Sequence, residues 1–213
     1  MIGHTITLVD ITDQRVRQQR LQVLDRTLRH NIRNRLDVIN AHAEQLDGEH
    51  ASAIRRNTEA LAELSSEARR IDSALDAAEP TEVSLPGFVD RIAADVSTSD
   101  TEVDVTAPEA TVRISREPCR YALRRVIEHA VTDAEASRVT VRVTVTQHRL
   151  RVTVASNGTV VSDNERAVVE SGREEQLSHA TSLWLWGTEW IVGQLNGTLS
   201  FEADTVVLVF PVG

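Results

Sequence analysis

The stretch LDRTLRHNIRNRLDVI, residues 24–39, carries an apolar residue at successive steps of four, four, four and three. Apolar residues at this spacing lie on one stripe of an α-helix, so the stretch predicts a helix with one buried side. His30 follows the stripe residue Leu28 by two positions, a rotation of about 200° at helical pitch. The sequence therefore predicts that His30 faces solvent, with Arg29 and Arg33 nearby. The stripe consists of Leu24, Leu28, Ile32, Leu36 and Ile39.

The same helical composition extends from Gln14 to Ala78, where the chain has no proline and a single glycine, Gly48. After Gly48, a second apolar stripe keeps nearly strict heptad spacing. Two such helices joined by a short loop predict an antiparallel hairpin. Because one hairpin would leave much apolar surface exposed, we expect a homodimer in which two hairpins form a four-helix bundle. The second stripe consists of Ile54, Leu61, Leu64, Ala68, Ile71 and Leu75.

From residue 80 onward, helical and strand patterns alternate. This alternation predicts a two-layer α/β sandwich, so the fold class of the whole chain is α+β. Residues 159–180 have little apolar rhythm and are a candidate mobile loop. The last helix is predicted to end at Asn196 and Gly197. Helices are predicted at 85–96, 116–134 and 181–197, and strands at 138–147, 150–158, 197–202 and 205–210.

Charge and composition limit the classes of protein to which the chain can belong. A net charge of −9 disfavours a general nucleic-acid binder, and the absence of an apolar run of about 18 residues disfavours a membrane span. All 23 basic residues are arginine, which together with abundant acidic residues favours a salt-adapted source. The single cysteine, Cys119, excludes an internal disulfide and favours a reducing, cytoplasmic location. The histidines lack the spacing of metal ligands.

Several stretches of the chain resemble sensor histidine kinases. LRHNIRN, residues 28–34, is similar to their phosphoacceptor box in the form associated with haloarchaeal members. Residues 6–24 resemble the exit of a PAS sensor domain, and residues 123–131 and 185–202 resemble two motifs of the kinase ATPase domain. The resemblance implies a PAS-like end at 1–13, a dimerisation and histidine-phosphotransfer hairpin at 14–79, and a GHKL-type ATPase domain at 80–213.

For the acceptor box, the resemblance implies that a neutral imidazole nitrogen of His30 attacks the γ-phosphorus of ATP. Many family members have an acidic residue next in sequence. Asn31, which stands there in this chain, can accept a hydrogen bond through its carbonyl oxygen but cannot take a proton. Asn34 occupies a position where the family often has Asn or Thr, which helps to place the water that hydrolyses the phosphorylated partner. Solvated polar side chains without such roles are the alternative for Asn31 and Asn34.

The ATP-binding motifs depart from the family pattern. Glu128 is the expected residue of the asparagine box, but His129 stands where the family offers an asparagine to Mg²⁺, and imidazole is a poor ligand for that ion. In the first glycine box, Ser156 replaces the aspartate that reads adenine, and Gly158 is the glycine that remains. Losing that charged hydrogen bond costs about 1.5–3 kcal/mol. The glycine positions of the second box hold Ala180, Ser182 and Trp184.

These departures leave two functions open. In the first, the protein is a pseudokinase without bound cofactor. It acts as a signalling scaffold or as a phosphotransfer intermediate whose His30 is phosphorylated by another protein. In the alternative, it is an active protein histidine kinase that uses ATP and Mg²⁺ to phosphorylate His30. Either protein would pass its phosphoryl group to an aspartate of a response-regulator receiver domain, and either could take its signal from an upstream sensor domain.

A basic segment precedes and includes the acceptor box. Seven arginines and one acidic residue lie between Gln14 and Arg35. This segment predicts a docking surface for an acidic partner such as a receiver domain, and a solvated helix face is the alternative.

Overall fold

A computed structural model describes residues 32, 35–46, 48–132, 136–163, 165–166 and 183–212. The chain divides into two compact units, Met1–Ser65 and Ser66–Gly213. The division falls within helix α2, Glu49–Asp76, ahead of the boundary that the sequence predicts after residue 79. The predicted PAS-like end lies outside the described residues, as does most of the phosphoacceptor box.

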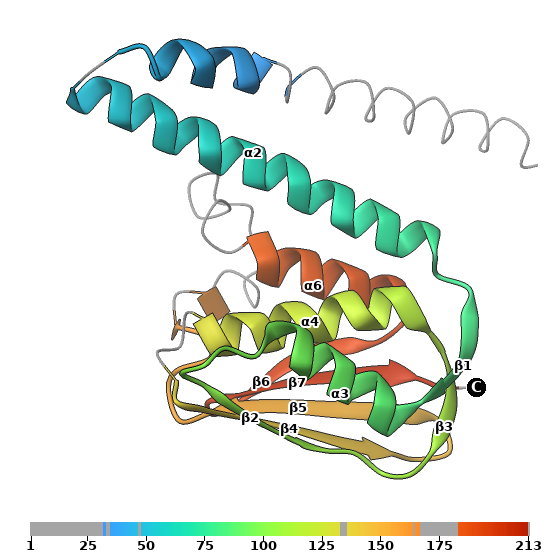
Figure 1. The fold of residues 1–213 in the computed structure, drawn as a ribbon. Coiled ribbons are helices and arrows are strands. Elements are labelled where there is room, and N and C mark those ends of the chain that lie inside the picture. The colour runs from blue at the N-terminus through green and yellow to red at the C-terminus, as the bar shows by residue number, and fades with distance from the viewer. Residues whose placement is uncertain are drawn as a thin grey trace, which may run out of the picture. The chain divides into compact units, whose positions relative to one another are not determined.

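The described part of the first unit is a helical hairpin. Residues 35–43 are helical and run antiparallel to the first part of α2, and Gly48 turns the chain between them with a φ of +103° (Figure 1). Arg55 Nη1 donates a hydrogen bond of 2.9 Å to the carbonyl of Ala43, which satisfies a backbone acceptor at the end of the first helix. The side chains buried in this hairpin are those of Leu36, Ala43, Ala51 and Thr58.

Other apolar side chains of the hairpin are exposed to solvent when one chain is considered alone. Leu46 is 53 % exposed, Ile54 is 40 % exposed and Leu61 is 49 % exposed. Ile54 and Leu61 belong to the second stripe that the sequence predicts. A second hairpin packed against this surface would bury them, so the four-helix bundle stays a prediction that a single chain does not test.

The second unit contains a five-stranded mixed sheet with the strand order β2-β4-β5-β7-β6. β2 pairs with β4 in parallel, and every other pair of neighbours is antiparallel. A separate antiparallel pair joins β1 to β3. The strands are β1 (Pro80–Ser84), β2 (Glu102–Thr106), β3 (Thr111–Ser115), β4 (Arg138–Val145), β5 (Arg149–Ser156), β6 (Thr198–Glu202) and β7 (Thr205–Pro211).

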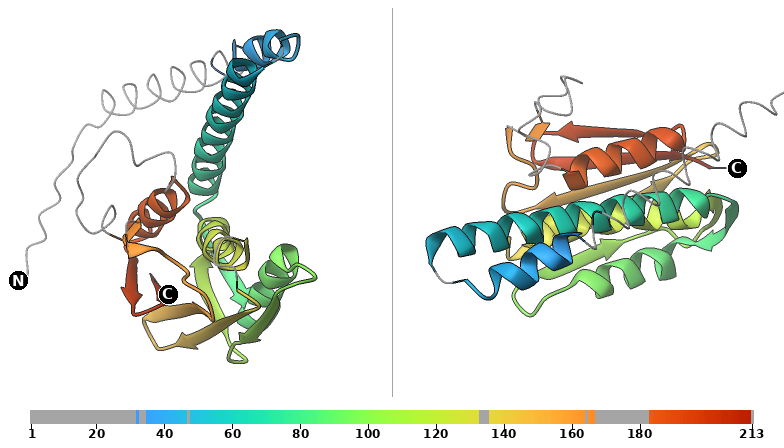
Figure 2. Two further views of the ribbon diagram at one scale, coloured as in Figure 1. Left: turned by 90° about the vertical axis from the view of Figure 1, so that its left-hand side faces the viewer. Right: turned by 90° about the horizontal axis from the view of Figure 1, so that it is seen from above.

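Three helices cover one face of the five-stranded sheet, with α4 between α3 and α6 (Figures 1 and 2). Burial alternates along the strands, as expected for a sheet with one covered face. In β4, Val139, Val141 and Val143 are buried, whereas the residues between them are not. The predicted α/β sandwich is therefore confirmed. The sequence pattern gave no indication of β1, β2 and β3, each of which has only five residues. The helices are α3 (Leu85–Val96), α4 (Arg116–Thr132) and α6 (Leu183–Gln194).

Helix α6 ends at Gln194, and the turn that closes it contains Asn196 and Gly197, as the sequence predicts. Asn196 adopts a left-handed φ of +56°, and the N–H of Gly197 donates to the carbonyl of Val192 at 2.9 Å. This closure satisfies carbonyls that the helix end leaves without a partner. A Cβ atom on Gly197 would lie 2.4 Å from the carbonyl oxygen of Val209 in β7, so the close approach of helix end and strand requires glycine.

The last turns of α2, from Ser66 onward, belong to the second unit. Ile71 is only 2 % exposed and is part of the sandwich core. Its neighbour in α6 is Gly187, where an added Cβ would lie 2.6 Å from Ile71 Cδ1 and 3.2 Å from Tyr121 Oη. The small residue in α6 thus makes room for two larger side chains. No helix in the part of the chain that the structure describes has the length and apolar character needed to cross a membrane.

Candidate functional site

Some of the predicted site residues lie outside the described part of the chain. These are His30, Asn31 and Asn34 of the acceptor box, together with Ala180 and Ser182 of the second glycine box. The roles assigned to them remain predictions. Glu128, His129, Ser156, Gly158 and Trp184 are described, all within the second unit.

His129 and Trp184 lie against each other between α4 and α6. Their rings are stacked, with centroids 4.0 Å apart and an angle of 27° between the planes. Glu165 Oε1 bridges them: it accepts a hydrogen bond from Trp184 Nε1 at 3.4 Å and lies 3.8 Å from His129 Nε2. Trp184 is 7 % exposed, and the side chains of His129 and Glu165 are 13 % and 15 % exposed. This cluster of three side chains occupies the space between the end of α4 and the start of α6.

Glu128 points away from that cluster, although it is the neighbour of His129 in sequence. Its carboxylate pairs with Arg125 Nη1 at 3.0 Å and Arg124 Nη2 at 3.9 Å. Adjacent helical residues are rotated by about 100°, which separates the two side chains. The structure therefore does not bring Glu128 and His129 together on one site.

The turn after β5 satisfies its own polar groups. Ser156 Oγ accepts a hydrogen bond from the N–H of Gly158 at 3.1 Å and donates to its carbonyl at 2.6 Å. The side chain of Asn157 accepts from the N–H groups of Ser137 and Arg138, each at 3.1 Å. Ser156 has an uncharged hydroxyl whose proton is already donated to the Gly158 carbonyl. It therefore cannot replace a carboxylate as the charged acceptor of a hydrogen bond from the amino group of adenine.

The donor atoms near His129 do not fit a hydrated magnesium ion. Mg²⁺ prefers oxygen ligands in octahedral geometry, whereas this cluster offers one imidazole and one carboxylate that already holds an indole N–H. Among the described residues no group of three or more His, Cys, Asp and Glu side chains gathers in a way that could hold a metal ion.

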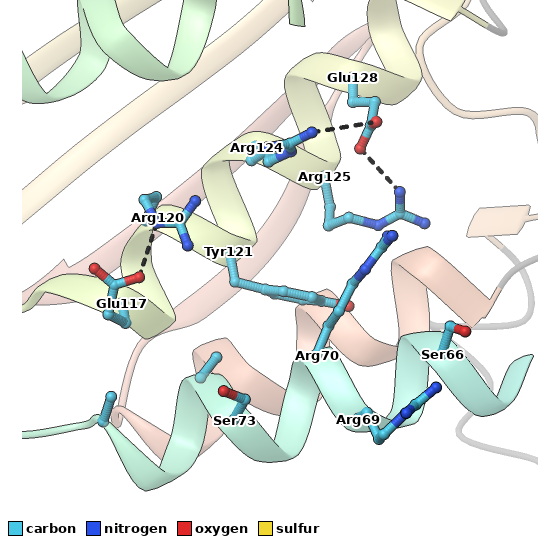
Figure 3. A pocket seen from close by; sticks show the side chains of 12 residues that line it. Ser66, Arg69, Arg70, Ser73, Glu117, Arg120, Tyr121, Arg124, Arg125 and Glu128 are labelled. Atoms are coloured by element: carbon cyan, nitrogen blue, oxygen red, sulfur yellow. Dashed lines mark hydrogen bonds and ion pairs between the residues drawn. The ribbon is translucent and has the colours of Figure 1, made fainter. Parts of the chain in front are cut away.

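The second unit also has a groove that the sequence did not predict. A groove of about 690 Å³ lies between the last turns of α2 and the outer face of α4, and arginine side chains from both helices point into it (Figure 3). We refer to it as the arginine groove. The spacing of arginines on the predicted helix 116–134, at steps of four and one, was a signal that could have pointed to it. Its arginines are Arg69, Arg70, Arg120, Arg124 and Arg125.

The floor of the arginine groove is a buried hydrogen-bonded group. Glu67, 6 % exposed, accepts a hydrogen bond of 2.5 Å from Tyr121 Oη and pairs with Arg125 Nε at 2.8 Å. Burial and the adjacent Glu67 carboxylate raise the pKa of the Tyr121 phenol. Burial alone would lower the pKa of Arg125, but Glu67 and Glu128 outweigh it and raise that pKa. Tyr121 therefore stays neutral and Arg125 stays charged at physiological pH, and both are fixed structural partners of Glu67.

Comparisons with known proteins find similar folds among solved structures. No protein-family model matches the chain, and no curated protein does. The ATP-binding domain of PrrB from Mycobacterium tuberculosis matches with a TM-score of 0.51 and 22 % identity, over 63 % of this chain and 98 % of that one. The Acinetobacter baumannii histidine kinase AdeS matches with a TM-score of 0.53 and 16 % identity, over 84 % of this chain and 94 % of that one.

Full-length ShkA in complex with AMPPNP matches with a TM-score of 0.58 and 18 % identity. That match covers 89 % of this chain and 45 % of ShkA. At such identities a likeness shows the fold alone. The chain has the fold of the ATP-binding domains of histidine kinases.

Proposed function

We propose that this protein is a two-component signalling protein of the sensor histidine kinase type whose nucleotide site does not bind Mg-ATP. The observation that carries the proposal is the stack of Trp184 on His129. The sequence resemblance places both residues at nucleotide-binding positions, one at the metal position and one at a phosphate-facing glycine position. In this protein those positions hold two rings in van der Waals contact with each other.

The stack removes the two features that bind phosphates at such a site, which are close backbone N–H groups and a ligand for the metal ion. Glycines near phosphates let the backbone approach and donate its N–H groups, and an indole ring in that space prevents the approach. Phosphoryl transfer further depends on positioning and on neutralisation of charge by a metal ion. The imidazole of His129 is a poor magnesium ligand, and Ser156 has no carboxylate for adenine. Each loss weakens nucleotide binding independently.

The remaining parts of the proposal come from the resemblance. His30 is the residue that carries phosphate, and Asn31 and Asn34 are one and four positions after it in the sequence. A receiver domain of a response regulator is the partner that exchanges phosphate with His30. The protein acts as a homodimer through residues 14–79. The exposed apolar residues of the hairpin support this assembly, because a second copy would cover them.

Nucleotide binding is the decisive measurement. We expect isothermal titration calorimetry of the purified protein to detect no Mg-ATP binding up to about 1 mM, and radiolabelled ATP to leave His30 unlabelled. A Trp184→Gly, His129→Asn variant restores space and an oxygen ligand and should regain measurable binding. Trp190→Gly is the matched control, because Trp190 is 39 % exposed on the same helix.

A dissociation constant of tens of micromolar for the unmodified protein, or label reaching His30 from ATP alone, would establish the active kinase instead. The acceptor role is tested separately with phosphoramidate, a chemical donor that phosphorylates imidazole. We expect the label it introduces to be lost in a His30→Gln variant. Label that persists there would rule out His30 as the main acceptor among the seven histidines.

A further inference from the structure

The arginine groove collects positive charge on an acidic protein. Five guanidinium groups line it, and the carboxylates within reach of them are those of Glu67, Glu117 and Glu128. The groove therefore has an excess of two positive charges, on a chain whose net charge is −9. A local charge of opposite sign to the whole molecule attracts a ligand that the rest of the surface repels.

Most of these guanidinium groups are available for exchange with a ligand. Arg120 pairs with Glu117 at 2.8 Å, but both side chains are about 40 % exposed, at 43 % and 38 %. Arg124 lies 3.9 Å from Glu128 and is itself 40 % exposed. Ion pairs with this exposure are weak, so an incoming anion can replace them at little cost. Arg69 is exposed and forms no ion pair within the described part of the chain.

The length of the groove favours an extended chain of carboxylates over a single phosphate. Its walls run from Ser66 on α2 to Ala77, just after the end of that helix, and from Glu117 to Glu128 on α4. Eleven residue steps at 1.5 Å give a length of about 16 Å. Arg120, Arg124 and Arg125 follow one another along α4, and the tip of Arg70 lies beside Arg125 (Figure 3). A single phosphate could reach only one or two of them, whereas a chain of carboxylates could reach them in succession. Guanidinium groups bind carboxylates in a planar, bidentate geometry.

We propose that the arginine groove is a docking site for an acidic polypeptide segment of a partner protein. Carboxylates of that segment displace Glu117 from Arg120 and Glu128 from Arg124, and meet Arg69 across the groove. Arg125 stays bound to Glu67 and keeps the floor in place. This site lies in the second unit, and the inference does not rest on the proposed function.

The test uses the full chain and a fluorescein-labelled peptide of about ten glutamate residues, which is long enough to follow the whole groove. Fluorescence anisotropy should show saturable binding, measured at the lowest ionic strength at which circular dichroism shows the protein folded. An Arg120→Gln, Arg124→Gln variant should weaken binding at least tenfold, and Arg69→Gln alone should weaken it about threefold. The control is Arg113→Gln, Arg142→Gln, which removes the same charge from exposed strand positions and should change binding less than twofold.

Added salt should weaken the binding, because exposed ion pairs are screened. Equal binding by the groove variant and the control variant would overturn the proposal, as would the absence of saturable binding. Inorganic tripolyphosphate serves as a competing probe. If it binds at the groove arginines and the glutamate peptide does not, the groove is a site for a compact anion and the proposal of a polypeptide is wrong.

Discussion

At the scale of single residues, Cys119 offers a probe of the core. It is the only cysteine, it is 1 % exposed, and burial raises the pKa of its thiol to about 12. Because the thiolate is the reactive form, a maleimide reagent at pH 8 should label the native protein at least about a hundredfold more slowly than the protein unfolded in guanidinium. Rapid stoichiometric labelling of the native protein would contradict the packing described for α4.

Glu189 on α6 should make stability depend on pH. Partial desolvation raises the pKa of its carboxyl group above the ordinary value although the residue is exposed, so the native state binds this proton more readily than the unfolded state does. The resulting destabilisation is absent at low pH and develops as the pH rises through the folded-state pKa. A Glu189→Gln variant should therefore have a higher Tm than the wild type at pH 7.5 and an equal Tm at pH 4.

The control for that experiment is Glu109→Gln, which removes the same charge from the exposed loop between β2 and β3. It corrects for the general benefit of losing one negative charge on an acidic chain. If both variants shift the Tm at pH 7.5 to the same degree, the effect belongs to net charge and not to Glu189.

At the scale of elements, two glycines of one helical segment should respond in opposite ways to the same substitution. Gly197→Ala should lower the free energy of unfolding by about 1–3 kcal/mol, because the new Cβ would meet the Val209 carbonyl oxygen, which is backbone and cannot move aside. Gly193→Ala should raise it by about 0.5–1 kcal/mol, because nothing lies within 4 Å of the new atom and alanine favours the helix. Urea unfolding measures both values, and equal effects would contradict the helix end described here.

The contact between α2 and α6 should appear as coupling between two substitutions. Gly187→Ala places a Cβ 2.6 Å from Ile71 Cδ1, and Ile71→Val deletes that methyl group. Each single change should destabilise the protein, the second by about 0.5–1.5 kcal/mol. The double variant should be more stable than the sum of the two effects predicts. Strict additivity would mean that Ile71 does not pack against Gly187.

The predictability of the elements follows from their length and their pattern. Long amphipathic segments such as α4, and strands with four alternating valines such as β4, were predicted from periodicity alone. β2 and β3 are short, and β1 begins at a proline, so none of them carries a period long enough to recognise. In the candidate site, the sequence identified His129 and Trp184 as unusual. It could not predict that they stack, because that contact joins helices far apart in the chain.

At the scale of the whole molecule, we expect a dimer in solution. Light scattering at micromolar concentration should give about twice the chain mass of 23.6 kDa, because the exposed apolar residues of the hairpin need a partner. Leu61→Gln with Leu64→Gln should shift the equilibrium toward monomer. Trp186→Gln is the control, since it removes a side chain that is 45 % exposed in the second unit. A monomeric mass for the unmodified protein would reject the predicted bundle.

The order of strands in the sheet has a consequence for how the protein is made. β7 is the last of the strands in sequence, yet it lies inside the sheet between β5 and β6. Until the ribosome has released residues up to Pro211, β5 has an open edge and β6 has no neighbour, and such edges invite wrong pairing. The sandwich therefore cannot assemble strand by strand during synthesis. Its nascent chain should depend on chaperones until the final strand emerges, and messages truncated before Thr205 should yield aggregated or degraded product.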